Sequence, residues 1–233
     1  MRGGVFIIYN ELTITFIFPQ NIELKFCNEY LSKVIAKAMT FNETLKIKHE
    51  ENTFKLYIFS LPAPLEPDRI YRSGRAYVFR IRSFDLHFLL SVKSSICNEN
   101  CGIKVMAAHI SPKPYRRISE ITSLTPVVCT LNSKYWICGN GILILRDKIF
   151  SNACRKTKLV FPEFKEPDEN FIDGIIQLNQ KNIVVKYKNA SILGAKVKIL
   201  IKNDENSQKL AYTIMGAGML EKNSIGLGFC IAK

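Results

Sequence analysis

The segment that most constrains the fold lies near the end of the chain, where two Gly-x-Gly pairs bracket a short polar turn. It runs from Gly216 to Phe229 and continues into an apolar segment that reaches Lys233. Glycine adopts φ > 0 easily and lets backbone N–H groups approach an anion closely. The segment therefore predicts either a loop that cradles a phosphodiester, with Lys222 adding charge, or an ordinary glycine-bounded hairpin.

The spacing of these glycines excludes two common nucleotide-binding motifs. A P-loop needs Gly-x-x-x-x-Gly-Lys-Ser/Thr at the start of a helix, whereas Lys222 is followed by Asn223 and by a segment that reads as a strand. A Rossmann unit needs a strand before the glycines and a helix after them, and this context is missing.

The charge of the chain favours a polyanionic partner. Its 233 residues include 33 Lys and Arg against 20 Asp and Glu, a formal net charge of +13. The apolar run from Val5 to Phe18 is interrupted by polar residues, which excludes a transmembrane helix and a signal-peptide core. We therefore expect a cytoplasmic protein that binds nucleic acid and no membrane.

The seven cysteines are odd in number and scattered, which is typical of reduced thiols and not of a disulfide framework. Only Cys97 and Cys101 are close enough to suggest a metal site. No second pair and no nearby histidine completes a zinc-binding set, so neither a metal nor another cofactor is expected.

Hydrophobic periodicity predicts strands and helices in both halves of the chain. In the first half, strands are expected at 12–18, 53–59, 76–82 and 103–110, and helices at 27–39 and 84–92. In the second half, strands are expected at 127–131, 142–145, 175–178, 183–187, 197–201 and 225–232, and helices at 149–159 and 208–215. Because this order suits a split β-α-β unit, we expect an α+β fold of two tandem ferredoxin-like (RRM-like) domains, residues 1–120 and 121–233.

In and just before the strand predicted at 76–82, arginines are interleaved with aromatic residues. Arg80 and Arg82 fall on one face of this strand, and Arg75 precedes it. In single-stranded RNA, bases stack on aromatic rings and phosphates pair with guanidinium groups. We therefore expect Arg75, Arg80 and Arg82 to contact RNA, with a solvated strand face as the alternative.

Four segments, taken in order, resemble the CRISPR-associated repeat-processing endoribonucleases of the Cas six family. The helix from Tyr30 to Ile35 resembles the first helix of the family, and Thr125 to Val128 resembles the opening strand of its second domain. The segment from His49 to Ser60 looks like the active-site segment. The C-terminal segment looks like the glycine-rich loop that binds RNA, through Gly216, Gly218, Lys222, Asn223, Ser224, Gly226 and Gly228.

The resemblance implies metal-independent cleavage of CRISPR precursor RNA within its repeats, by attack of a 2′-hydroxyl that leaves a 2′,3′-cyclic phosphate and a 5′-hydroxyl. His49 suits the proton transfers because the unperturbed histidine pKa is about 6.5, and Lys55 suits the developing negative charge. Where the family carries a tyrosine base, this chain has Ala36. Tyr30, the third catalytic candidate, lies about 240° around the helix from that position.

Two other functions remain open at this point. A non-cleaving RNA-binding protein of the same architecture would keep the basic strand and the glycine-rich loop without a competent active site. A basic scaffold subunit of a ribonucleoprotein would bind any RNA alike. Formation of a homodimer and membership of a CRISPR effector complex are left open as well.

Overall fold

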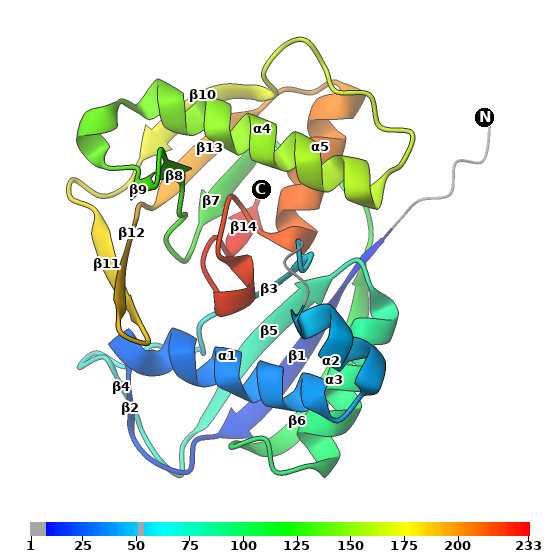
Figure 1. Ribbon diagram of the computed structural model, residues 1–233, viewed down its shortest axis with the longest axis vertical. Helices are drawn as coiled ribbons and strands as arrows, with labels where there is room; N and C mark the ends of the chain where they lie inside the picture. The colour runs from blue at the N-terminus through cyan, green and yellow to red at the C-terminus, as the bar shows by residue number, and fades with distance from the viewer. Residues whose placement is uncertain (1–7, 51–53) are drawn as a thin grey trace.

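The computed structural model describes residues 8–50 and 54–233 and places them in two four-stranded antiparallel sheets, each with helices on one face (Figure 1). The first sheet has the order β3-β5-β1-β6, and its unit consists of β1 (Tyr9–Ile17), α1 (Leu24–Thr40), α2 (Glu43–Glu50), β3 (Tyr57–Phe59), β5 (Ala76–Ser83), α3 (Leu86–Asn98) and β6 (Lys104–Lys113). The second has the order β10-β13-β7-β14, and its unit consists of β7 (Glu120–Ser123), α4 (Ile142–Val160), β10 (Ile172–Gln177), β13 (Val197–Ile201), α5 (Glu205–Ala217) and β14 (Cys230–Ala232).

In the described part of the chain, the two units also contain three two-stranded pairs and two short 3₁₀ helices. They are β2 (Ile22–Glu23) with β4 (Ile70–Tyr71), β8 (Thr130–Leu131) with β9 (Lys134–Tyr135), β11 (Ile183–Tyr187) with β12 (Ala190–Gly194), η1 (Cys138–Asn140) and η2 (Asn223–Ile225). The β11-β12 hairpin belongs to the second unit but contacts α1 of the first.

Both sheets share one topology. Setting aside α2 and the small pairs, each unit runs β-α-β-β-α-β, and the first strand pairs with the third and the fourth. The α+β fold of two tandem ferredoxin-like units expected from the sequence is therefore confirmed. The chain passes between the sheets from Lys113 to Glu120. The division into domains at residue 120 stays a prediction.

The core of the first unit is built by alternation in β1 and by one stripe of α1. Leu12, Ile14 and Phe16 are fully buried against the helices, while the residues between them lie on the opposite face of the sheet. The stripe of α1 that faces the sheet is also buried, and it consists of Leu31, Val34, Ile35 and Ala38.

Two predicted strands of the second half are wrong. The apolar run 142–145 forms the first turn of α4, because the buried residues continue at helical spacing through Leu145, Ile149 and Ala153. A run of four apolar residues does not distinguish a strand from such a helix. The strand predicted at 127–131 is reduced to β8 and two isolated bridges, and β7 takes its place in the sheet.

The cysteines form no cross-links. All seven are free thiols, and burial raises the pKa of Cys154 and Cys230 to about 12, so both stay protonated. Within the described residues, no group of three His, Cys, Asp or Glu side chains is arranged to hold a metal ion. None of the described helices has both the length and the apolar character that crossing a membrane requires.

One buried arginine joins the two units. Arg82, on β5, is 7% exposed, and its Nε donates to Glu11 Oε2 on β1 at 2.6 Å. Its Nη1 donates to two carbonyl oxygens of the second unit, Cys230 O at 2.8 Å and Met215 O at 3.4 Å. The guanidinium carbon also lies 4.3 Å from the centre of the Phe229 ring. Arg82 thus ties the first sheet to α5 and β14.

Replacing Arg82 should destabilise the whole molecule. Burial raises the pKa of Glu11, but the charges of Arg82 and Lys113 outweigh burial and hold that pKa below its usual range, so the carboxylate is ionised. Arg82→Met leaves this charge buried with a poorer partner, and we expect a loss of about 3 kcal/mol in the free energy of unfolding. Urea unfolding measures it. Arg80→Met, a matched change at a half-exposed neighbour, should cost less than about 1 kcal/mol. Equal losses in the two variants would contradict this role.

Candidate nucleic-acid interface

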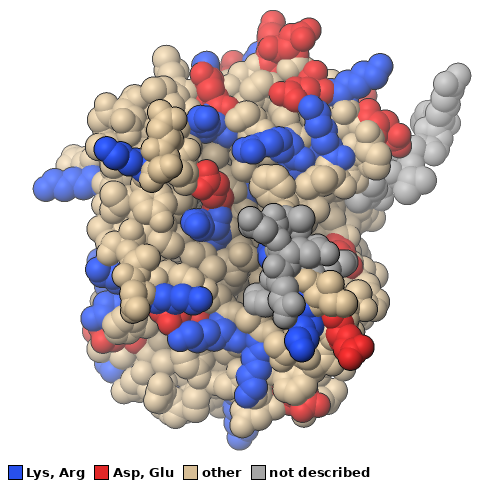
Figure 2. All heavy atoms as spheres, viewed as in Figure 1, with Lys and Arg blue, Asp and Glu red and all other residues tan. Residues whose placement is uncertain are grey.

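The glycine-rich loop, residues 218–229, lies between the two units, with α1 on one side and α4 on the other (Figure 1, red). It contains η2 and continues into β14. The strand predicted at 225–232 is therefore shorter than expected. Gly226 and Gly228 both have a φ of 81°, which an extended strand does not allow. On this face of the molecule, Lys and Arg side chains lie over both α1 and α4 (Figure 2).

The loop packs directly on the first unit. A Cβ atom added at Gly226 would lie 2.6 Å from Cε2 of Phe59 and 2.7 Å from Nδ2 of Asn28. Asn28, on α1, donates this Nδ2 to Ile225 O at 2.9 Å. The structure therefore brings together three segments singled out in the sequence: the first helix, the segment that ends at Ser60, and the glycine-rich loop.

A buried lysine holds the loop from the other side. Lys156, on α4, is 2% exposed, and its Nζ donates to Gly218 O at 2.8 Å, Leu220 O at 2.7 Å and Asn223 Oδ1 at 2.6 Å. Burial lowers the pKa of Lys156 to about 7. No sequence pattern pointed to this residue, because a lysine within Cys-Arg-Lys-Thr-Lys reads as part of a solvated face.

The glycines of this segment do not frame an open cradle, which was one of the two arrangements expected from their spacing. A Cβ atom at Gly216 would lie 2.5 Å from Cε2 of Phe84, and one at Gly218 would lie 2.5 Å from Nδ2 of Asn223. At Gly228 it would meet the backbone carbonyl oxygen of Met219. These glycines allow the protein to pack closely on itself. Contact with RNA through their amides remains a proposal.

The polar tip of the loop is its accessible part. Lys222 is exposed, and Asn223 and Ser224 are half-buried. The side-chain amide of Asn223 donates to Met219 O at 3.2 Å and Leu227 O at 2.8 Å, so it braces the loop from within. Lys222 and Ser224 are therefore better placed than Asn223 to meet a ligand with their side chains.

The predicted catalytic segment adjoins the loop. The backbone of His49 lies in the last turn of α2, whereas its side chain is outside the described part of the structure, as are residues 51–53. Lys55 is half-buried just before β3. The ring centre of its neighbour Phe54 lies 5.8 Å from the guanidinium carbon of Arg155 and 6.0 Å from Nζ of Lys156, both on α4.

Tyr30 is engaged elsewhere. Its hydroxyl donates to Gly102 O at 2.5 Å, and its ring packs edge-on against Phe18 at 5.4 Å. Burial raises the pKa of Tyr30, which keeps the hydroxyl protonated. This arrangement gives Tyr30 a structural role and does not favour the catalytic one expected from the sequence.

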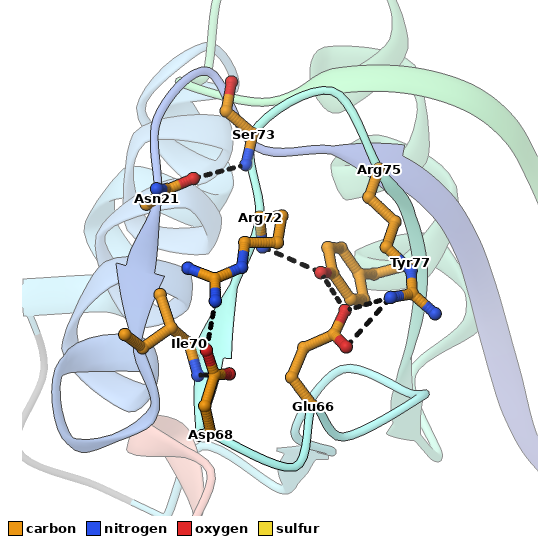
Figure 3. A network of polar contacts seen from close by, with 8 residues as sticks. All are labelled: Asn21, Glu66, Asp68, Ile70, Arg72, Ser73, Arg75 and Tyr77. Carbon is orange, nitrogen blue, oxygen red and sulfur yellow. Dashed lines mark hydrogen bonds and ion pairs between the residues drawn. The ribbon is translucent and has the colours of Figure 1, made fainter.

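The three arginines predicted to contact RNA have different surroundings. Arg75 is ion-paired with Glu66 at 2.8 Å, and Tyr77 donates its hydroxyl to the same carboxylate at 2.5 Å (Figure 3). Arg80 lies on the sheet face that the helices leave uncovered. Arg82 was expected to share that role, but its guanidinium is buried between the units. Among the three, Arg80 is the best placed for a ligand on the sheet face.

A cleft of about 430 Å³ opens beside Arg80, between the two units. Lys113 and Arg116 also line it, as does Glu11, whose carboxylate pairs with Lys113 at 3.0 Å. The two cations come from the end of β6 and from the segment that follows it, a stretch whose charge is visible in the sequence although its position beside Arg80 is not. The cleft therefore offers several cations, with one carboxylate among them, to an anionic ligand.

The close packing around Gly228 predicts that even a methyl group there disturbs the fold. Gly228→Ala places a Cβ atom against Met219 O at a φ of 81°, so the loop must move. We expect a loss of about 2 kcal/mol or more in the free energy of unfolding, measured in urea. The matched control is Gly139→Ala, where no atom lies within 4 Å of the added Cβ and the change should stay within about 0.5 kcal/mol. An undiminished stability of Gly228→Ala would show that the loop is open after all.

Solved structures share this fold over nearly the whole chain. A structure described as CRISPR associated protein Cas6 is 17% identical, covers 97% of this chain and 99% of its own, and superimposes with a TM-score of 0.68. A Cas6-related protein from Pyrococcus furiosus is 16% identical, with coverages of 97% and 98% and the same TM-score of 0.68. A third, described as a RAMP protein binding different RNA substrates, is 14% identical, with coverages of 97% and 99% and a TM-score of 0.68.

No protein-family model and no curated protein sequence matches the chain. The likeness therefore rests on structure, and it covers 97% of the chain in each of these three comparisons. The chain has the Cas6 fold, and the resemblance read from its sequence is confirmed at the level of the fold.

Proposed function

We propose that this protein binds CRISPR repeat RNA and cleaves it within the repeat. The observation that carries the proposal is the contact between the glycine-rich loop and the strand that follows Lys55, in a chain that shares its fold with Cas6 structures over 97% of its length. This contact supports the proposal because it joins the segment expected to be catalytic to the loop expected to bind RNA.

The proposed chemistry is transesterification by the RNA itself. A base removes the proton of the 2′-hydroxyl, the 2′-oxygen bonds to the adjacent phosphorus, and the bond from phosphorus to the 5′-oxygen breaks. The departing oxygen takes up a proton, which leaves a 2′,3′-cyclic phosphate and a 5′-hydroxyl. His49 would move the protons, and Lys55 would stabilise the charge on the phosphate oxygens. Because Tyr30 is bonded to Gly102, the proposal assigns it no step.

Positively charged side chains would bind RNA phosphates on two surfaces of the protein. Lys222 and the amides of the loop would meet the phosphates nearest the cleaved bond. In the cleft, Arg80, Lys113 and Arg116 would pair with phosphates farther along the strand. Phosphate contacts of this kind fix the position of the RNA and carry no sequence information directly.

The alternative is a protein that binds repeat RNA without cutting it. Two observations favour it: the first helix has Ala36 where a family tyrosine is expected, and Tyr30 is committed to a backbone carbonyl oxygen. This alternative keeps both proposed binding surfaces and removes only the chemistry. The two functions are therefore separated by a cleavage assay.

The assay is single-turnover cleavage of end-labelled repeat RNA in excess EDTA. The native protein should cut, because the proposed groups need no metal. A substrate with 2′-deoxyribose at the scissile nucleotide should bind and stay intact, since it lacks the nucleophile. His49→Ala should slow cleavage by roughly 10²- to 10⁴-fold with binding nearly unchanged. Lys55→Ala should weaken both, because a cation beside the phosphate acts in the ground state and in the transition state.

The control for these variants is His87→Ala, which removes an exposed histidine on α3 and should leave cleavage unchanged. Cleavage of the deoxy substrate, or full activity of His49→Ala, would contradict the mechanism. Binding without cleavage by the native protein would favour the alternative.

A further inference from the structure

The ammonium group of Lys156 is saturated by the glycine-rich loop. An ammonium has three N–H donors, and all three find acceptors there: Gly218 O, Leu220 O and Asn223 Oδ1. The first two acceptors are backbone carbonyl oxygens in the turn that leads from the end of α5 into the loop. Asn223 in turn donates to two further loop carbonyls. One side chain therefore fixes the entry of the loop and, through Asn223, its tip.

The charges around Lys156 do not form an ion pair with it. The Glu221 carboxylate accepts from Thr130 instead, from the backbone nitrogen at 3.0 Å and from Oγ1 at 2.7 Å. Cys230 stays a neutral thiol, and Arg155 adds a like charge. Carrying a cation into the interior without a carboxylate partner costs stability, unless its hydrogen bonds compensate. The loop supplies those hydrogen bonds.

We propose that Lys156 is a positioning residue that holds the glycine-rich loop in the conformation that binds RNA. The inference rests on the proposed function of the loop, but the hold itself does not depend on RNA. By drawing the carbonyl oxygens of Gly218 and Leu220 inward, Lys156 orients the backbone on which Lys222 and Ser224 sit.

Proton linkage sets how the hold depends on pH. Burial lowers the pKa of Lys156 to about 7, Arg155 acts in the same direction, and Glu221 and Cys230 oppose it. When the loop opens and Lys156 meets water, its pKa returns toward the ordinary lysine value of about 10.4. The held state therefore releases the proton first, so loop opening should be easiest below pH 7 and should become less favourable as the pH rises from about 7 toward about 10.

The first experiment compares Lys156→Met, which keeps the apolar stem and removes the donors, with Lys158→Met on the same helix. Lys158 is half-exposed and pairs with Glu166 outside the loop. Hydrogen–deuterium exchange of the amides in 218–229 should speed up in Lys156→Met and stay native in Lys158→Met. The Kd for repeat RNA should rise at least about fivefold in the first variant and stay near native in the second.

The second experiment measures exchange of the same amides between pH 7 and 8.5 and converts it to an equilibrium constant for loop opening, with the intrinsic exchange rate at each pH taken into account. In the native protein this constant should fall at least about fivefold over that range, whereas in Lys156→Met it should be flat. A lysine that does not leave its buried site when the loop opens would give no such difference in profile. Because the native profile needs no variant, it tests the hold even if Lys156→Met fails to fold.

The outcomes separate the two proposals. Unchanged exchange in Lys156→Met, or a flat native profile, would overturn the role of Lys156. Faster exchange with an unchanged Kd would also overturn it, because the held conformation would then not matter for RNA. If the native protein binds no repeat RNA at all, the proposed function fails. The exchange data would then show whether the hold exists on its own, and the role in binding would be overturned with the function.

Discussion

A buried arginine at the junction of the two units links the halves of this molecule. Arg82 is anchored to Glu11 within the first sheet and donates to the carbonyl oxygens of Met215 and Cys230 in the second unit. A guanidinium group can do this because its donors lie in a rigid plane and point in several directions at once. The contact fixes how the sheets sit relative to one another. It thereby fixes both the cleft beside Arg80 and the space in which the glycine-rich loop lies.

Within that space the loop is held from both units and has little freedom. Gly226 lies against Phe59 and Asn28 of the first unit, and Lys156 of the second binds the carbonyl oxygens at its entry. The glycines permit close internal contact, while Lys222 stands at the accessible tip. A loop fixed in this way can present amides and a cation to a phosphate without first being ordered, which lowers the cost of binding.

The fold could be predicted from the sequence, but the burial of two charged side chains could not. Periodicity located the helix that contains Leu31 and Val34, and the order of elements was sufficient for two ferredoxin-like units. It failed at 142–145, where a short apolar run carries no period. Arg82 and Lys156 were out of reach for a different reason: a charged residue in a basic chain is expected at the surface, and only tertiary contacts show that these two are buried. The catalytic role of His49 rests on the resemblance alone.

Photo-crosslinking of repeat RNA, with 4-thiouridine placed along the repeat and the linked peptides identified by mass spectrometry, tests the central claim most directly. If RNA is bound as proposed, the crosslinks should fall on the loop residues 218–229 and on the cleft formed by β5, β6 and the segment that contains Arg116. A competitor RNA without the repeat sequence should displace the label poorly. Crosslinks concentrated on the outer surface of α3, or lost equally to any RNA, would contradict the claim that the loop and the cleft form a repeat-specific RNA-binding site.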